Sequence, residues 1–210
     1  MVFDPDKQVD KIVDIVNTNN FLHHTTILTG SNGSGKSLIR KIIWSRIKSE
    51  LESSGVEVKE NGHLVASVSM ERRTNSSLLG FGALNCLARD STWSPTSQET
   101  FHFIDGLLET SDRYLVIDEP EIGMAEEMQL LLCQFINEKL QTLNSHGVLI
   151  ITHSRTIVKN LVHDQFINMD GLGEDEWLSR EVKLPEYTYE EFKKRSHELF
   201  LAIEKRLKKS

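Results

Sequence analysis

The chain has 210 residues, of which 39% are hydrophobic and 26% charged, and its formal net charge is −7. This length indicates one domain over residues 1–210, and the composition is typical of a globular protein with no apolar run long enough to span a membrane. The net charge does not indicate nucleic-acid binding. Two widely spaced cysteines and the lack of a signal-peptide pattern predict a cytoplasmic protein with reduced thiols.

Hydrophobic spacing predicts alternating helices and strands along the chain. The expected elements are, in chain order, a helix over 6–17, a strand over 25–29, a helix over 37–53, a strand over 64–70, a helix over 75–89, a helix over 98–109, a strand over 114–117, a helix over 126–143 and a strand over 148–151. Near-continuous apolar strands separated by helices predict an α/β fold with three layers, in which helices cover both faces of a mostly parallel sheet.

The C-terminal part is expected to add two further features. Residues Gln165–Met169 and Glu181–Leu184 are predicted to pair as a β-hairpin over the turn Gly171–Glu176. Residues 189–210 are predicted to form a closing C-terminal helix.

Residues 30–37 match the phosphate-binding pattern G-x-x-x-x-G-K-[ST], between a predicted strand and a predicted helix. The matching residues are Gly30, Ser31, Asn32, Gly33, Ser34, Gly35, Lys36 and Ser37. The glycines permit a close backbone approach, so that successive N–H groups can point at phosphate oxygens. We expect Lys36 to reach the β- and γ-phosphates and Ser37 to bind Mg²⁺. A glycine-rich turn that binds nothing is the alternative, and such a match arises by chance in about one chain per hundred.

Polar residues follow two of the predicted buried strands. Asp118 and Glu119 end the strand at 114–117, and His153 follows the strand at 148–151. Because ligands bind at the carboxyl ends of strands in open α/β sheets, we expect Asp118 to hold Mg²⁺ and Glu119 to orient or deprotonate an attacking water. His153 could hydrogen-bond a γ-phosphate or that water. The alternatives are a strand that stops at a polar turn and a histidine that serves only packing.

Three motifs together, Gly30–Ser37, Asp118-Glu119-Pro120-Glu121 and Thr152-His153-Ser154, resemble the ATP-binding-cassette (ABC) class of P-loop ATPases. These motif sequences are most similar to those of soluble RecF-like, SMC-like and OLD-type members and of small phage or defence-system ATPases. The resemblance covers residues 25 to 170. It implies a P-loop NTPase fold, ATP and Mg²⁺ as ligands, and ATP held between the protomers of a homodimer.

The resemblance also implies a signature motif that would contact the γ-phosphate held by a second protomer. Its register falls on residues 94–98, where Ser97 and Gln98 are the candidate contacts and Pro95 departs from the family pattern. Thr96-x-x-Glu99 is equally a capping box that begins a helix. The glutamine loop of the family is absent from the sequence, and the region at 72–95 is shorter than the helical subdomain of transporter ATPases.

We therefore expect an ATP-hydrolysing switch that dimerises on ATP and drives a separate effector protein. DNA repair or antiviral defence is the setting that the resemblance suggests. Two alternatives stay open: a nucleotide-gated binding module with negligible hydrolysis, and the ATPase subunit of a membrane transporter. A nucleotide or small-molecule kinase would share the phosphate loop but would not explain the pair Glu119 and His153.

Overall fold

A computed structural model of the chain describes residues 4–31, 34–36, 39, 42–43, 46, 49, 52–53, 65–69, 96–108, 114–143, 145–181 and 188–207. The expected helix over 75–89 and the shortened region at 72–95 lie outside the described residues. The described residues between 36 and 53 with a helical backbone agree with the predicted helix that follows the phosphate loop.

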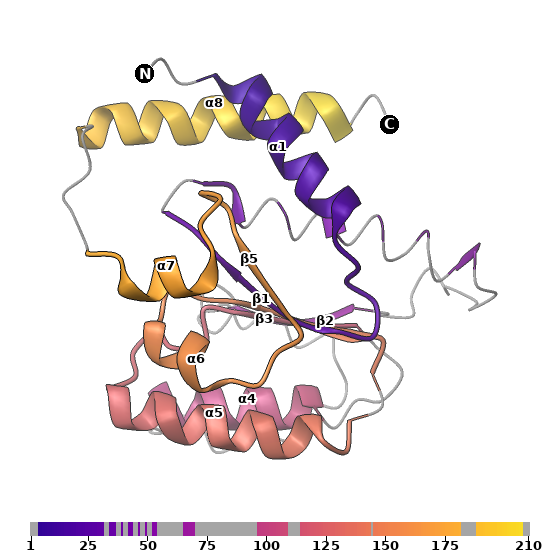
Figure 1. Cartoon of the computed structure of the whole chain (residues 1–210), viewed down its shortest axis with the longest axis vertical. Coiled ribbons are helices and arrows are strands. Elements are labelled where there is room, and N and C mark those ends of the chain that lie inside the picture. The colour runs from indigo at the N-terminus through magenta and orange to yellow at the C-terminus, as the bar shows by residue number, and fades with distance from the viewer. Residues whose placement is uncertain are drawn as a thin grey trace.

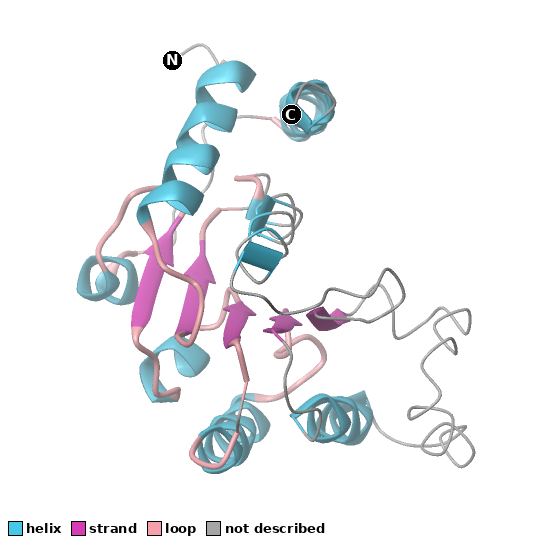
Figure 2. Cartoon of the chain, turned by 90° about the vertical axis from the view of Figure 1, so that its right-hand side faces the viewer, coloured by secondary structure: helices cyan, strands magenta, loops and turns pink. Residues whose placement is uncertain are grey.

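The strands form one five-stranded sheet with the order β2-β3-β4-β1-β5, and every neighbouring pair is parallel. The bounds are β1 (Thr25–Thr29), β2 (Val65–Ser69), β3 (Tyr114–Asp118), β4 (Gly147–Ile151) and β5 (Gln165–Asn168). Figure 2 shows the strands side by side with helices above and below them. All carboxyl ends therefore lie at one edge of the sheet, and β4 separates β1 from β3.

The described helices cover both faces of this sheet (Figure 1). Their bounds are α1 (Pro5–Thr18), α4 (Thr96–Leu108), α5 (Glu126–Leu140), α6 (Arg155–Asn160), α7 (Glu174–Ser179) and α8 (Tyr189–Leu207). Helix α1 packs against α8 on one side, while α4, α5 and α6 belong to the core on the other side. The three-layer prediction is thus confirmed.

The start of α1 illustrates how the sequence specifies an element. Asp4 caps the helix, since its side chain accepts a hydrogen bond from the backbone N–H of Lys7, and Pro5 supplies the fixed φ favoured in a first turn. Val9, Ile12 and Val16 are buried at a spacing that places them on one face. That face packs toward the sheet.

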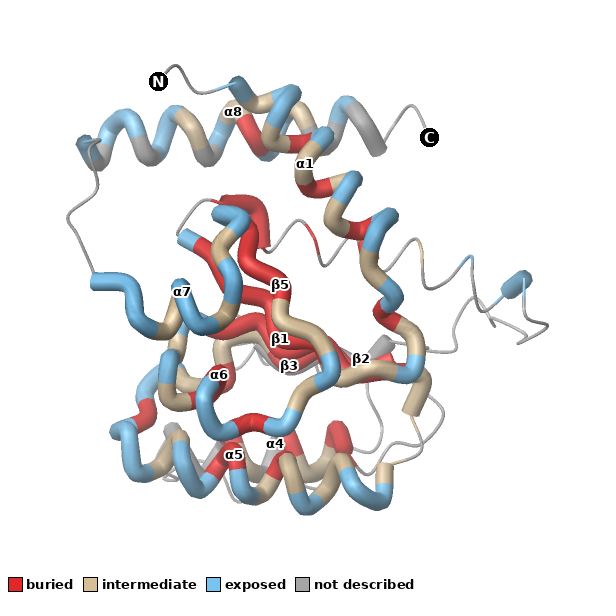
Figure 3. The backbone as a smooth tube through the Cα atoms, in the orientation of Figure 1, coloured by how far each residue is buried: buried red, intermediate tan, exposed pale blue. Residues whose placement is uncertain are grey.

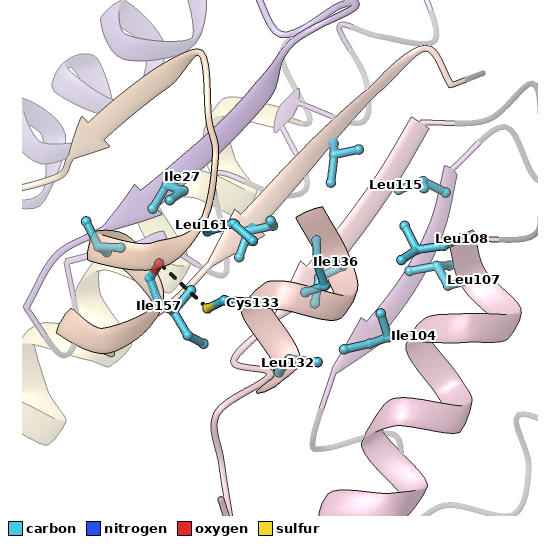
Figure 4. Packing of buried hydrophobic residues seen from close by; sticks show 14 of the residues in the cluster. Ile27, Ile104, Leu107, Leu108, Leu115, Leu132, Cys133, Ile136, Ile157 and Leu161 are labelled. Carbon is cyan, nitrogen blue, oxygen red and sulfur yellow. Dashed lines mark hydrogen bonds between the residues drawn. The ribbon is translucent and has the colours of Figure 1, made fainter. Parts of the chain in front are cut away.

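Side-chain alternation along the strands divides the core into two clusters. Leu28, Val116 and Leu149 face the α1 and α8 side. Ile27, Leu115 and Val148 face the α4, α5 and α6 side, where Figure 4 shows Cys133 and Ile136 of α5 packed among them. The buried positions in Figure 3 accordingly concentrate on the strands and on the inner helix faces. Each such side chain stabilises the fold by about 1.5–3 kcal/mol.

The predicted turn at Gly171–Glu176 is wrong in its second half, while the pairing of the expected C-terminal hairpin stays a prediction. Residues Gln165–Asn168 form β5, which pairs in parallel with β1 at the edge of the sheet. Part of the expected turn at Gly171–Glu176 belongs to helix α7, which begins at Glu174. The residues 182–184 of the expected second strand lie outside the described residues. None of the helices among the described residues is both long and apolar enough to cross a membrane.

Candidate functional site

The predicted phosphate loop, the carboxylates and the histidine meet at the carboxyl edge of the sheet. The loop follows β1, Asp118 ends β3, and His153 comes shortly after β4. Ile151 of β4 pairs with Leu28 on one side and with Asp118 on the other. The chain after β4 therefore leaves the sheet between the loop and the carboxylates.

Two glycines of the loop have conformations and surroundings that exclude a side chain. Gly30 has a φ of +154°, and a Cβ there would lie 2.6 Å from the Cβ of Met169. Gly35 has a φ of +99°, and a Cβ there would lie 2.7 Å from Cδ1 of Ile12. The close packing of Met169, which follows β5, and of Ile12 in α1 against the loop explains why the chain needs glycine at both positions. Asn32, Gly33 and Ser37 lie outside the described residues, so their assigned roles stay predictions.

The side chain of Lys36 lies back along the loop. Its Nζ donates hydrogen bonds to the carbonyl oxygens of Gly30 and Ser31, each at 3.0 Å, and the residue is only 7% exposed. Burial lowers the pKa of Lys36, while nearby carboxylates, Glu119 first, act in the opposite direction. A buried cation thus sits against the loop where an anionic phosphate could be bound.

The hydroxyl of Ser34 provides a test of whether the loop fits a phosphate. Its Oγ is buried and has no hydrogen-bond partner among the described residues. The Ser34 carbonyl oxygen, in contrast, accepts a hydrogen bond from Nε2 of Gln8 in α1 at 3.1 Å. An unpaired buried hydroxyl is costly in a folded chain. Together with the glycine backbone and the Lys36 ammonium, it fits a site for phosphate oxygens.

Glu119 and His153 form a pair of side chains at the carboxyl ends of β3 and β4. Nε2 of His153 lies 3.4 Å from Oε1 of Glu119, and each side chain is 36% exposed. Glu119 has a φ of +51°, a conformation that non-glycine residues seldom adopt and that recurs at functional sites. Its backbone N–H donates to the Ile151 carbonyl at 2.8 Å, which fixes this turn to β4.

The charge state of His153 follows from its surroundings. Burial lowers the pKa of His153, and the positive charge of Lys36 lowers it further, whereas Glu119 raises it. A lowered pKa favours the neutral imidazole at pH 7, which has one donor nitrogen and one acceptor nitrogen. The ring can therefore either donate to a carboxylate or accept from a water.

Glu121 was not assigned a role from the sequence, although it belongs to the Asp118-Glu119-Pro120-Glu121 motif. Its Oε1 accepts a hydrogen bond from the backbone N–H of His153 at 2.7 Å. Burial raises the pKa of Glu121, while hydrogen bonds to its carboxylate, including one from the Thr152 side chain, lower it. Glu121 thus joins the turn after β3 to the end of β4. The sequence did contain a signal for this role, because Glu121 follows Glu119 by two residues with Pro120 between them.

Asp170 was also missed. It follows β5, and its Oδ2 accepts hydrogen bonds from the backbone N–H and the hydroxyl of Ser31, at 2.9 and 2.8 Å. The reasoning that identified Asp118 and His153 at strand ends applies to Asp170 as well.

The candidate signature residues Ser97 and Gln98 lie in the first turn of α4. Helix α4 begins at Thr96, as the capping-box interpretation of Thr96-x-x-Glu99 predicted to within one residue. The side chains of Ser97 and Gln98 are outside the described part of the structure. Their contact with a second protomer remains a prediction.

Comparisons with known proteins add little to this geometry. No protein-family model matches the chain, and a search of curated proteins found no similar sequence. Among solved structures, the chain is similar to the Aeropyrum pernix Orc1 protein in complex with DNA, with 19% identity and a TM-score of 0.40. The match covers 92% of this chain and 48% of that one, so this chain spans about half its length.

A similarity of this size does not bear on function. The fold assignment rests on the parallel sheet, on the strand–loop–helix context of residues 30–37 and on the carboxylates two strands away. On these grounds the chain has a P-loop NTPase fold.

Proposed function

We propose that the chain binds ATP through the loop at 30–37 and hydrolyses it. One observation carries the proposal: the Lys36 ammonium, Glu119 and His153 come together at one edge of the sheet from the segments that follow three different strands. The buried Lys36 and the 3.4 Å distance between His153 and Glu119 support a shared site rather than separate structural roles. Packing alone would not require two ionisable side chains beside a buried lysine.

The loop would hold the triphosphate through its backbone N–H groups and the Lys36 ammonium. The unpaired Ser34 hydroxyl supplies one further donor toward the phosphates. Asp118 and Ser37 are the residues that would hold Mg²⁺, which when bound neutralises charge on the phosphate oxygens. The resemblance to ABC ATPases favours ATP over GTP as the nucleotide.

Glu119 is proposed as the general base. It accepts a proton from a water whose oxygen forms a bond to the γ-phosphorus, while the bond from that phosphorus to the β–γ bridging oxygen breaks and ADP leaves. His153 keeps the Glu119 carboxylate oriented from the end of β4. Glu121 in turn holds the His153 backbone N–H at 2.7 Å, so the base and its neighbour are fixed from both strands.

The proposal extends to an ABC-type switch that forms an ATP-dependent homodimer. Ser97 and Gln98 at the start of α4 would contact the γ-phosphate bound to the partner protomer. A helix N-terminus suits that role because its free N–H groups bind anions. Hydrolysis would reopen the dimer and move a separate effector protein, with DNA repair or antiviral defence as the setting that the sequence resemblance favours.

The experiment is steady-state phosphate release, compared between the wild type and three variants. Lys36→Ala should abolish ATP binding and turnover, whereas Lys7→Ala, which removes an exposed lysine paired with Asp4 on α1, should leave both unchanged. Glu119→Gln should keep ATP binding and lose at least about a hundredfold in turnover. Unchanged ATP affinity in Lys36→Ala would refute the assignment of residues 30–37 as the phosphate-binding loop. If the wild type released phosphate no faster than Glu119→Gln, the proposed hydrolysis would be refuted and the nucleotide-gated binding module would be favoured.

The dimer is tested separately by light scattering. Glu119→Gln with ATP and Mg²⁺ should double in mass, and the same protein with ADP should not. A monomer under both conditions would contradict the ABC-type switch while leaving single-chain hydrolysis intact.

A further inference from the structure

Aspartates hold the β5 strand to the β1 segment at both ends. At the amino end, Oδ2 of Asp164 accepts a hydrogen bond from the backbone N–H of Thr25 at 2.7 Å. At the carboxyl end, Oδ2 of Asp170 accepts from both the N–H and the hydroxyl of Ser31, at 2.9 and 2.8 Å. The two aspartates resemble each other in chemistry, but only Asp170 touches the phosphate loop.

The turn that presents Asp170 is itself built on a buried side chain. Asn168 is 6% exposed, and its Nδ2 donates to Oγ1 of Thr29 at 2.9 Å. Its Oδ1 accepts hydrogen bonds from the N–H groups of Asp170 and Leu172, at 2.9 and 3.2 Å. The N–H of Gly171 closes the turn on the Asn168 carbonyl at 2.9 Å. The position of the Asp170 carboxylate is thus fixed by β1 and β5 rather than by a free loop.

Ser31 is consequently held from two sides. Asp170 takes its N–H and hydroxyl, and Nζ of Lys36 donates to its carbonyl oxygen at 3.0 Å. Lys36 also donates to the Gly30 carbonyl at 3.0 Å. The orientation of the peptide units at the start of the loop therefore depends on Asp170 and Lys36 together.

We propose that Asp170 is a positioning residue of the ATP site, which fixes Ser31 and thereby sets the shape of the phosphate loop before ATP binds. This inference rests on the proposed function. The charge of the carboxylate favours the ammonium of Lys36 but opposes an incoming triphosphate, so the proposed role belongs to its acceptor oxygen. Its contribution to the site is therefore geometric.

The acceptor and the charge are separated by two substitutions at one position. Asp170→Ala removes both the acceptor and the charge, whereas Asp170→Asn keeps an acceptor oxygen for Ser31 and removes the charge. Asp164→Ala is the matched control, since it removes the hydrogen bond to Thr25 at the amino ends of the same two strands. Thermal unfolding of each variant shows how much the fold itself is affected.

The first measurement is the affinity for ATP with Mg²⁺ by calorimetry. We expect Asp170→Ala to bind about tenfold more weakly than the wild type, the usual effect of losing hydrogen bonds to a charged group. Asp170→Asn and Asp164→Ala should both bind about as tightly as the wild type. Wild-type affinity in Asp170→Ala, or an affinity in Asp170→Asn as low as in Asp170→Ala, would overturn the proposal.

The second measurement needs no nucleotide. Hydrogen exchange of the peptide containing Ser31 should become faster in Asp170→Ala, and stay at the wild-type rate in Asp170→Asn and Asp164→Ala. Unchanged exchange in Asp170→Ala would overturn the anchoring role. If the wild type binds no ATP, the proposed function fails and with it the role of Asp170 in nucleotide binding, while exchange still decides whether Asp170 holds the loop.

Discussion

Replacing Gly35 by alanine should destabilise the fold through a contact with α1. The φ of +99° at Gly35 is unfavourable for any residue with a Cβ, and the added Cβ would lie 2.7 Å from Cδ1 of Ile12. Ile12 is fully buried, at 0% exposure, so its terminal methyl group has little room to move. Both the backbone conformation and the steric contact therefore oppose the substitution.

The two contributions can be estimated separately. A positive φ costs an L-residue about 1–2 kcal/mol, and overpacking in a buried site costs about 1–3 kcal/mol. Gly35→Ala should therefore lose about 2–5 kcal/mol of the free energy of unfolding. Gly171→Ala is the matched control: its φ is +84°, but the nearest atom to a Cβ there is Nζ of Lys11 at 3.9 Å. It should lose only the backbone contribution, about 1–2 kcal/mol.

The assay is urea unfolding followed by circular dichroism. Ile12→Val is measured both alone and combined with Gly35→Ala. Ile12→Val removes the Cδ1 atom and should cost about 1 kcal/mol in the wild type. In Gly35→Ala it should cost nothing or restore stability, because it removes the atom that the new Cβ meets. Equal losses for Gly35→Ala and Gly171→Ala, or additive losses for Gly35→Ala and Ile12→Val, would refute this packing of α1 on the loop.

Three further substitutions test other contacts. Tyr114→Phe should leave the free energy of unfolding unchanged or raise it by about 1 kcal/mol, since the buried hydroxyl has no partner among the described residues; a loss of more than about 1 kcal/mol would reveal such a partner. Ser154→Ala should cost about 1–2 kcal/mol, because Oγ caps α6 at the Ile157 N–H and donates to Gln129; a cost under about 0.5 kcal/mol would contradict the cap. Because its folded-state pKa is lowered, His153 takes up a proton more readily in the unfolded chain, so stability should fall as the pH drops through about 6.5. His153→Asn should weaken that fall, and identical pH profiles would show that His153 does not cause it.

Local sequence was sufficient for the parts of the site that lie at the ends of predicted strands. The loop, Asp118 and His153 each follow a short apolar strand, and parallel pairing brings such ends to one edge whatever the strand order. The order itself came from the structure, which puts β4 between β1 and β3. Periodicity does not contain this information, because strand order depends on long-range pairing.

The error in the predicted turn has a specific physical source. The glycines at Gly171 and Gly173 suggested a hairpin turn, yet Glu174, Asp175 and Glu176 are acidic residues of the kind that favours the start of a helix, here α7. The sheet position of 165–168 depends on contacts far away in sequence. The parallel pairing of β5 with β1 is such a contact, and no local pattern predicts it.

Helix α5 shows a further limit of hydrophobic periodicity. Its apolar stretch includes Leu130 and Leu131, which are 45% and 52% exposed, and Leu132, which is fully buried. Three consecutive leucines cannot all face the core of a helix with 3.6 residues per turn. The sequence shows that a helix is present but not which leucine faces inward.

The sheet order also governs when the proposed nucleotide site can form during synthesis. Strand β1 lies near the N-terminus, but its partners in the sheet are β4 and β5, and Ser31 bonds to a residue 139 positions later. At about 5–20 residues per second, the ribosome needs roughly 7–28 s to add that length of chain. During that time the phosphate-loop segment exists without the neighbours that shape it. The first motif to be translated is therefore among the last parts to become functional, and premature termination before β5 would yield a chain that carries the complete loop sequence without its edge strand.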